Sequence, residues 1–337
     1  MIHSGTIALS DNSDLFYTYD QSSFDLQSIN SPNVKHVIGL DIPLYPEISA
    51  EYKYTGLTCW LEQETKRLIK MEPKDPVYDT NYNFVFNLNK KQINRYMLLK
   101  LVEWFELDNY TYTWSGIGGK TFDMSDMIND WHNSRFIKQE PEDFKSYMLA
   151  PIVAMEPRFF SQQGELITVD KDELVAYTET TNTLPWKNFL GDMHRKSGIT
   201  FIAESVKFDK CTFFTEKTVY SVLAYNFPLW IGGGYAQADL WEKIGFDTFN
   251  DVIDHSYQYE ESLFDRIYLA FKLNLELIKD YNKIKELRKL HMPRFIKNKQ
   301  LLLDNQLGKY NNSILETLEP ESRQKIVTLI NSLFVNQ

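Results

Sequence analysis

The sequence predicts an α/β protein with a doubly wound, mostly parallel sheet, and three observations support this prediction. Strand-like and helix-like segments alternate over residues 82–114 and again over residues 198–249. The chain has 337 residues, which is long for one average domain and suits two lobes around a cleft. Apolar residues make up 43% of the chain and charged residues 24%, values that are typical of a globular protein with a sizeable core.

Residues 1–80 are predicted to form strands and loops. Two short β-type runs occur before residue 20, and a longer apolar run at 34–48 is ended by two prolines. The segment 55–61 (TGLTCWL) is predicted to be a further strand. The segment 71–81 (MEPKDPVYDTN) is predicted to be a linker, because prolines and charged residues dominate it.

The clearest strand–helix–strand unit spans residues 82–114. Residues 82–88 (YNFVFNL) are predicted to form a buried strand, and residues 110–114 the next one, as expected in a parallel sheet. Asn94 is predicted to cap the helix between them, which places Arg95 in the first turn. Apolar residues then recur at helical spacing, namely at Leu98, Leu101, Val102 and Phe105.

The segment 117–195 interrupts this alternation, because it is polar and less periodic, with a hairpin predicted around 161–170. The alternation then resumes, with strands predicted at 198–205, 228–233 and 246–249 and helices at 215–227 and 235–245. Gly245 is predicted to end the second of these helices. From about residue 260 the chain is predicted to be helical, with breaks near Pro293 and Pro320.

Charged residues fall at two of the predicted helix starts. Ligands of doubly wound sheets bind beyond the carboxyl ends of the strands, where helix N-termini favour anions. Arg95 and Lys217 in two such first turns predict a diphosphate site. Glu216 suits a pair of ribose hydroxyls, because a carboxylate accepts two hydrogen bonds at once. Glu216 and Lys217 also fit a solvated surface pair, and their spacing does not separate the two interpretations.

Other chemical motifs give weaker signals. The run 231–234 (IGGG), with Gly233 at its centre, would let a ligand approach the backbone closely. It does not match GxGxxG, and no Walker sequence occurs, so dinucleotide and P-loop sites are not predicted. The run 170–173, with Asp170 and Asp172, is similar to a metal-binding Asp-x-Asp pair and fits a solvated turn equally well. No paired HExxH spacing and no nucleophile elbow occur, so no metal site is predicted.

Charge and cysteine usage point to a compartment and limit the partners. A net charge of −10 gives no overall attraction to nucleic acid or to an acidic membrane, although a local basic groove remains compatible. Cys59 and Cys211 fit neither a disulfide framework nor a zinc site, so a reducing, cytoplasmic environment is expected. No signal peptide and no run of about 18 apolar residues occur, so no membrane partner is expected.

Residues 201–257 carry three motifs in order, namely FIAES, FFTEKTVYSVLAYNFPLWIGGG and LWEKIGFDTFNDVIDHSY. This order resembles glycosyltransferases of tailed phages and other large DNA viruses. It is also similar to the donor-binding half of the α-1,3-fucosyltransferases, which carry Glu-Asn-Ser followed by Thr-Glu-Lys. The segment 84–104 is similar to the part of those enzymes whose arginine contacts the donor diphosphate, and the matching residue is Arg95. The resemblance covers under half of the chain, roughly residues 82–115 and 200–300.

The resemblance implies a GT-B-like fold, with two Rossmann-like lobes around a cleft and a helical C-terminal tail. The implied division is a reduced, acceptor-side lobe at 1–80, a nucleotide-sugar lobe at 81–275 with an irregular insertion at 117–195, and C-terminal helices at 276–337.

The resemblance also implies which residues bind the donor. Lys217 and Arg95 would meet the diphosphate, Glu216 would meet the ribose, and Thr215 belongs to the same Thr-Glu-Lys motif. Glu204 and Ser205 lie where those enzymes have Glu-Asn-Ser, but the asparagine is missing. Guanine is therefore not assumed, and the donor is expected to be UDP- or GDP-linked.

The sequence therefore predicts a glycosyltransferase that uses a nucleotide-diphosphate sugar. Arg95 and Lys217 would stabilise charge on the leaving diphosphate, so no obligatory metal is expected. An inverting reaction also needs a base, and Asp41 after an apolar strand is the candidate, although such aspartates often only form turns. The alternative is a non-catalytic sugar- or nucleotide-binding module that keeps the fold.

The acceptor is left open between a glycan, a protein and a hydroxymethylated pyrimidine in viral DNA, the last implying the cytoplasm of an infected host. DNA would require a basic surface that meets the phosphates. The candidates for this surface are Lys297 with Lys299, and the run 283–294 (KIKELRKLHMPR), in which Arg288 and Lys289 are the expected contacts. The run 283–294 fits a solvated face as well.

Overall fold

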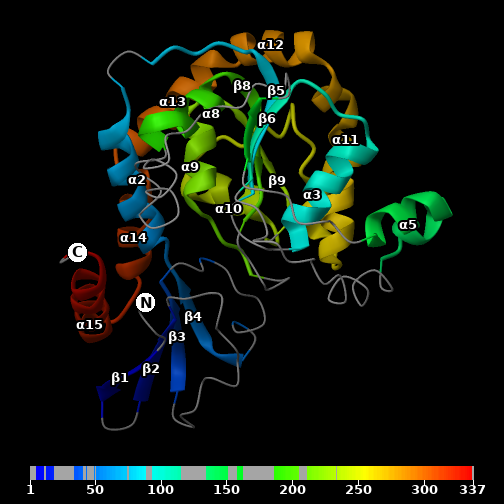
Figure 1. The fold of residues 1–337 in the computed structure, drawn as a ribbon. Coiled ribbons are helices and arrows are strands. Elements are labelled where there is room, and N and C mark those ends of the chain that lie inside the picture. Colours follow the sequence, from blue (N-terminus) through cyan, green and yellow to red (C-terminus); the bar gives the residue numbers. More distant parts are fainter. Residues whose placement is uncertain are drawn as a thin grey trace.

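The computed structural model of the chain is a mixed α/β protein with two sheets and many helices (Figure 1). The predicted α/β class is confirmed, and the arrangement is compatible with a Rossmann-like fold. The residues that the structure describes are 5–10, 13–18, 34–40, 43, 49, 51–73, 76–88, 93–114, 134–150, 158–161, 186–204, 211–232 and 234–335.

The larger sheet has five strands in the order β7-β6-β5-β8-β9. All neighbours pair in parallel except β6 and β7, so an antiparallel strand closes one edge of a parallel sheet. The strands are β5 (Tyr82–Leu88), β6 (Tyr110–Trp114), β7 (Arg158–Ser161), β8 (Ser197–Ile202) and β9 (Phe227–Trp230).

Helices cover both faces of the larger sheet, because successive strand residues point to opposite sides. Phe84 and Phe86 of β5 belong to a core that includes α3 (Ile93–Trp104) and α11 (Leu263–Lys279). Val85 and Trp230 belong to the opposite core, which includes α2 (Cys59–Met71) and α9 (Glu216–Leu223).

The strand order gives the larger sheet a switch point between β5 and β8. From β5 the chain crosses to β6 through α3 on one face, and from β8 it crosses to β9 through α9 on the other face. Neighbouring connections that leave in opposite directions open a crevice beyond the carboxyl ends of those two strands, and ligands of such sheets bind there. Helices α3 and α9 therefore begin on opposite sides of this crevice.

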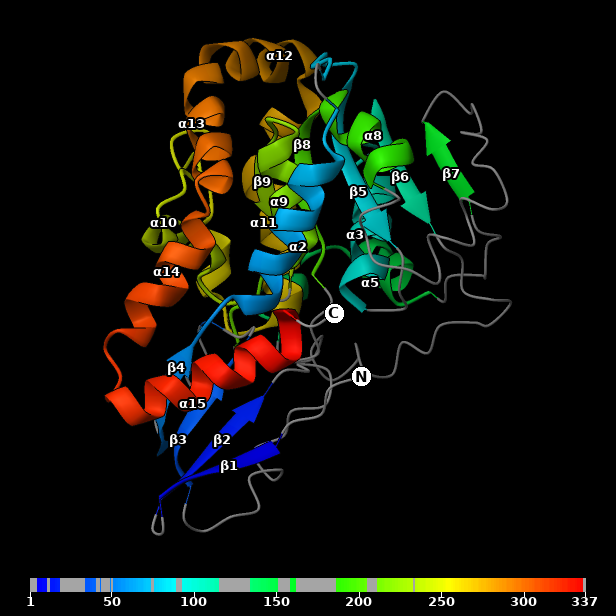
Figure 2. The same cartoon turned by 90° about the vertical axis from the view of Figure 1, so that its left-hand side faces the viewer.

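The smaller sheet has the order β1-β2-β3-β4, with an antiparallel first pair and parallel pairs after it. Its core contains Ile38, Leu40 and Leu57, and it is completed by Leu318 and Ile326 from the far end of the chain. Figure 2 shows α15 lying beside this sheet. The elements are β1 (Gly5–Ser10), β2 (Ser13–Thr18), β3 (Val34–Gly39), β4 (Lys53–Gly56) and α15 (Pro320–Ile330).

Helix α2 links the two sheets and sets their relative direction. It begins three residues after the end of β4 and packs against the larger sheet, so the carboxyl ends of β3 and β4 point toward that sheet. The chain then runs up α2 and returns down β5 (Figure 1). The carboxyl ends of β5 and β8 consequently point back toward the smaller sheet, so the carboxyl edges of the two sheets face each other.

Five α-helices follow one another from residue 263 onward, and two of them, α11 and α15, have been described above. The predicted breaks at Pro293 and Pro320 are confirmed: each proline lies in the first turn of a helix, where its missing N–H is not needed. Gly245 ends α10 in a left-handed conformation with φ 116°, as predicted. The helices not yet given are α5 (Glu142–Leu149), α8 (Gly191–Arg195), α10 (Gln237–Ile244), α12 (Tyr281–Leu290), α13 (Met292–Leu303) and α14 (Gln306–Leu315).

Three local predictions are wrong. The segment 55–61 is not a strand, because β4 ends at Gly56 and α2 begins at Cys59. Residues 246–249 form no strand and run irregularly from α10. Asn94 does not cap α3, which begins at Ile93, and its side chain donates instead to the backbone of Glu204, two residues after β8. The predicted hairpin at 161–170 lies outside the described residues after Ser161.

Candidate functional site

The first turn of α3 is tied to the carboxyl end of β8. The Asn94 side chain donates a hydrogen bond from Nδ2 to the backbone oxygen of Glu204 at 2.7 Å. The Arg95 guanidinium donates from Nη2 to the backbone oxygen of Ala203 at 3.4 Å. Arg95 is 1% exposed, so the structure holds this cation in the interior at the switch point.

The first turn of α9 is built around a buried carboxylate. Thr215 caps the helix, and its hydroxyl oxygen accepts from the backbone N–H of Lys217 at 3.3 Å. Glu204 accepts from the Thr215 backbone N–H at 2.9 Å, from the Thr218 hydroxyl at 3.2 Å and from the Thr215 hydroxyl. Burial raises the pKa of Glu204, and Lys217 and the Thr215 hydrogen bonds act against that rise. Glu204 therefore uses both carboxylate oxygens to fix the start of α9.

Glu216 and Lys217 form a buried ion pair at the same helix start. Lys217 Nζ lies 2.8 Å from Glu216 Oε1, and it also donates to the Thr215 hydroxyl at 3.4 Å. Glu216 is 6% exposed and Lys217 is 5% exposed, so the alternative of a solvated surface pair is wrong. An ammonium has three hydrogens, and two of those on Lys217 have partners among the described residues. The third hydrogen has no partner within the part of the chain that the structure describes.

The structure thus brings together five of the residues that the sequence singled out. Arg95, Glu204, Thr215, Glu216 and Lys217 all lie at the first turns of α3 and α9 or at the carboxyl end of β8.

The other predicted positions, Asp41, Ser205, Gly233, Asp170 and Asp172, lie outside the described residues. The backbone of Leu40, next to Asp41, accepts a hydrogen bond from Cys59 N–H at 2.9 Å. Leu40 follows β3 at the edge of the smaller sheet that faces the larger one.

The sequence did not predict a role for Glu64. The segment 55–61, which contains the start of α2, was expected to be a strand, so no helix face was assigned there. Glu64 is 2% exposed and accepts from Arg67 Nη1 at 2.8 Å. The available signal was the helical spacing of Leu61, Thr65 and Leu68, which all lie on the buried side of α2.

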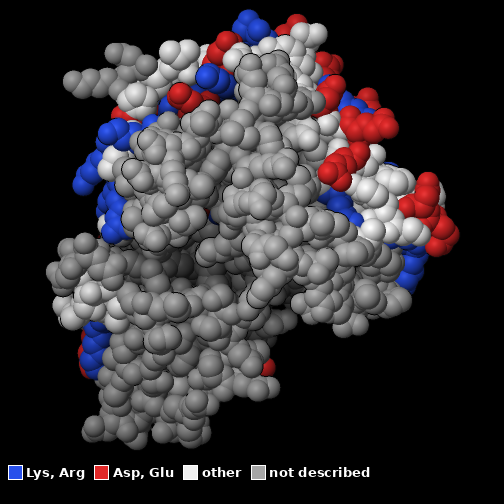
Figure 3. All heavy atoms as spheres, viewed as in Figure 1, with Lys and Arg blue, Asp and Glu red and all other residues white. Residues whose placement is uncertain are grey.

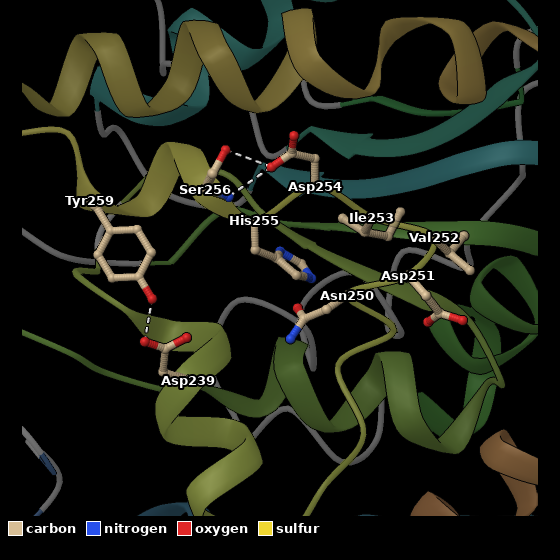
Figure 4. A pocket seen from close by; sticks show the side chains of 9 residues that line it. All are labelled: Asp239, Asn250, Asp251, Val252, Ile253, Asp254, His255, Ser256 and Tyr259. Carbon is tan, nitrogen blue, oxygen red and sulfur yellow. Dashed lines mark hydrogen bonds between the residues drawn. The ribbon is translucent and has the colours of Figure 1, made fainter.

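A separate cavity of about 530 Å³ lies between α10 and the segment that follows it (Figure 4). Its lining includes Asp239, Asp251 and Asp254. Two hydroxyl groups of the lining bond to these carboxylates: Tyr259 donates to Asp239, and Ser256 donates to Asp254 at 2.6 Å. This lining repels a diphosphate, so the cavity does not suit the anionic part of a nucleotide.

The basic run 283–294 is exposed only in part, since Lys289 is exposed and Arg288 is not. Arg288 is 3% exposed, and it donates to four backbone oxygens, those of Asp79, Arg195, Ala224 and Tyr225. Arg294 pairs with Asp247 and Asp251. Around α12, basic and acidic side chains alternate on the face shown in Figure 3. Arg288 is therefore a structural residue, and the prediction that it contacts phosphate is wrong.

No group of three or more His, Cys, Asp or Glu residues within the described part of the chain is arranged to hold a metal ion. Among the described helices, none is long and apolar enough to cross a membrane. Comparison of the chain with protein-family models, with curated proteins and with solved structures found no match.

Proposed function

We propose that the protein is a glycosyltransferase of GT-B type that transfers a sugar from a nucleoside diphosphate to an acceptor hydroxyl. One observation carries this proposal: two helices on opposite faces begin at the switch point, and each holds a buried cation in its first turn, Arg95 in α3 and Lys217 in α9. Glu216 lies beside Lys217. A nucleoside diphosphate offers the anion and the hydroxyls that these groups select.

In the proposed reaction the bond between the anomeric carbon and the diphosphate breaks, and negative charge builds on the leaving oxygen. Arg95, the third hydrogen of Lys217 and the two helix dipoles stabilise this charge. Burial of both cations strengthens their attraction for the phosphates, because little water competes there. No residue in this step requires a metal ion.

The acceptor is proposed to bind on the side of the smaller sheet, whose carboxyl edge faces the switch point. Asp41, directly after Leu40, is the proposed base that removes the proton from the acceptor hydroxyl in an inverting reaction. A glycan, a protein or a modified pyrimidine in DNA remains a candidate acceptor. The buried thiols of Cys59 and Cys211 are compatible with the proposed cytoplasmic location.

The proposal predicts that Lys217→Ala weakens the binding of UDP, GDP or their sugars by roughly tenfold to a hundredfold. The reason is that a charge-assisted hydrogen bond contributes about 1.5–3 kcal/mol. Isothermal calorimetry on the folded variant measures the change, and Lys289→Ala, at an exposed lysine of α12, is the matched control. Unchanged affinity in Lys217→Ala would remove Lys217 from the site.

Donor hydrolysis across common nucleotide sugars then separates an enzyme from a binding module. Turnover that survives EDTA supports charge stabilisation by Arg95 and Lys217, whereas loss of turnover that Mn²⁺ or Mg²⁺ restores contradicts it. Tight nucleotide binding with neither hydrolysis nor transfer favours the non-catalytic module. If no nucleoside diphosphate binds at all, the proposal fails.

A further inference from the structure

Helix α2 presents a carboxyl group to the first turn of α9. Leu61 and Leu68 of α2 share a hydrophobic core with α9, and the two helices pack against each other. Glu64 lies between these leucines at positions i+3 and i−4, so it is on the same face of α2. This face of α2 packs against α9, and the negative charge of Glu216 at the start of α9 raises the pKa of Glu64, in agreement with that packing.

Glu64 is buried with one oxygen unused. Its Oε1 accepts from Arg67, but Oε2 has no hydrogen-bond partner among the residues that the structure describes. Buried polar atoms almost always have a partner, and leaving one unsatisfied is costly. Burial raises the pKa of Glu64, Arg67 lowers it and Glu216 raises it further. A hydrogen-bond donor from a ligand would satisfy the unused oxygen.

The groups around the start of α9 define the chemistry of that ligand. Glu204 is fully engaged within the protein, whereas among the described residues one oxygen of Glu64 and one hydrogen of Lys217 have no partner. A ligand that fits both carries a hydroxyl group close to an anionic group. The ribose diphosphate part of a nucleotide has this combination.

We propose that Glu64 completes the donor site from the α2 side by accepting a hydrogen bond from a ribose hydroxyl of the bound nucleotide, next to Glu216. This inference rests on the proposed function, since it assumes that a nucleoside diphosphate binds at the switch point. Glu64 then helps the site to select ribonucleotides over deoxyribonucleotides. Because α2 follows β4 directly, the segment that leads out of the smaller sheet contributes to donor binding.

The test compares UDP and GDP with their 2′-deoxy and 3′-deoxy forms by calorimetry. A site that bonds a hydroxyl discriminates against an analogue that lacks it. We expect Glu64→Met to reduce the preference for the ribonucleotide by about tenfold, whereas Glu64→Gln, which keeps an acceptor oxygen, retains most of the preference. The analogue whose discrimination disappears identifies the hydroxyl. Glu286→Met, at an exposed position of α12, is the matched control.

If Glu64 has a purely structural role, its replacement should weaken the binding of ribo and deoxy forms equally or not at all. Glu64→Met leaves Arg67 without its carboxylate partner, but the Arg67 side chain is 38% exposed and can be solvated, so we expect only a small change in the unfolding temperature. Equal loss of affinity for ribo and deoxy forms, or an unchanged preference, overturns the inference alone. If Glu64→Met does not fold, Glu64→Gln must keep the preference and Glu64→Asp, with its shorter side chain, must lose it. Absence of any nucleotide binding by the unchanged protein overturns the proposed function as well.

Discussion

His194 shows how a single buried side chain couples the larger sheet to pH. It is fully buried, and its Nε2 lies 2.9 Å from Asn87 Nδ2 while its Nδ1 lies 3.2 Å from the Thr200 hydroxyl oxygen. Because the amide nitrogen of Asn87 donates, Nε2 accepts and the proton is on Nδ1. Burial lowers the pKa of His194 to about 3, and the charges of Arg195 and Lys217 lower it too. The imidazole is therefore neutral in the folded protein.

This neutral histidine predicts a specific loss of stability in acid. The pKa of His194 is about 3 when folded and about 6.5 when unfolded, so between these values the unfolded chain binds more protons. The contribution of the neutral His194 to the free energy of unfolding is fully present above about pH 6.5 and is lost as the pH falls toward 3. Relative to His194→Gln, the free energy of unfolding should fall by about 1.4 kcal/mol for each pH unit between 6 and 4.

Urea denaturation of both proteins at several pH values measures this difference. Other buried histidines are present in both proteins, so their effects cancel. A stability difference that stays constant from pH 7 to pH 4 would show that His194 has the same pKa in the folded protein as in the unfolded chain.

Helix α9 has only eight residues, so its stability depends strongly on the capping contacts at its start. Thr215 caps the helix, and its hydroxyl also bonds to Glu204, so Thr215→Ala removes the cap and leaves a buried carboxylate oxygen without that partner. We expect Thr215→Ala to lower the free energy of unfolding by about 2 kcal/mol. Thr215→Ser keeps the hydroxyl group, so its free energy of unfolding should fall much less. Urea unfolding separates the two variants, and equal losses would show that the methyl group matters instead.

The two ends of the chain together form the core of the smaller sheet. Ile326 of α15 is completely buried against residues of β3 and of the segment after β4. Ile326→Ala should destabilise this sheet by about 2–5 kcal/mol, because it leaves a cavity there. Hydrogen exchange should then quicken at the amides of β3 and β4 while β5 and β8 stay protected.

Arg323→Ala, at an exposed position of the same helix, is the control for Ile326→Ala. If β5 and β8 lose protection together with β3 and β4, the two sheets unfold as one cooperative unit rather than separately.

Local sequence signals sufficed wherever an element is defined by its own residues. The change from strand to helix period over 82–114 predicted β5, α3 and β6, and Gly245 predicted the end of α10. The start of α9 at Thr215 and Glu216 follows from capping chemistry, which involves only neighbouring residues. Capping chemistry also predicts Lys217 in the first turn of α9, whereas Arg95 lies in the first turn of α3 although the predicted Asn94 cap is wrong.

Tertiary structure decided which of these residues are buried and which segments meet. Glu216 and Lys217 are interior because other elements cover the start of α9, and Arg288 is interior because backbone oxygens from distant segments surround it. Glu64 is buried only because α2 is a helix that packs against α9. Burial and long-range contacts depend on residues far apart in the chain, so periodicity and spacing alone do not contain them.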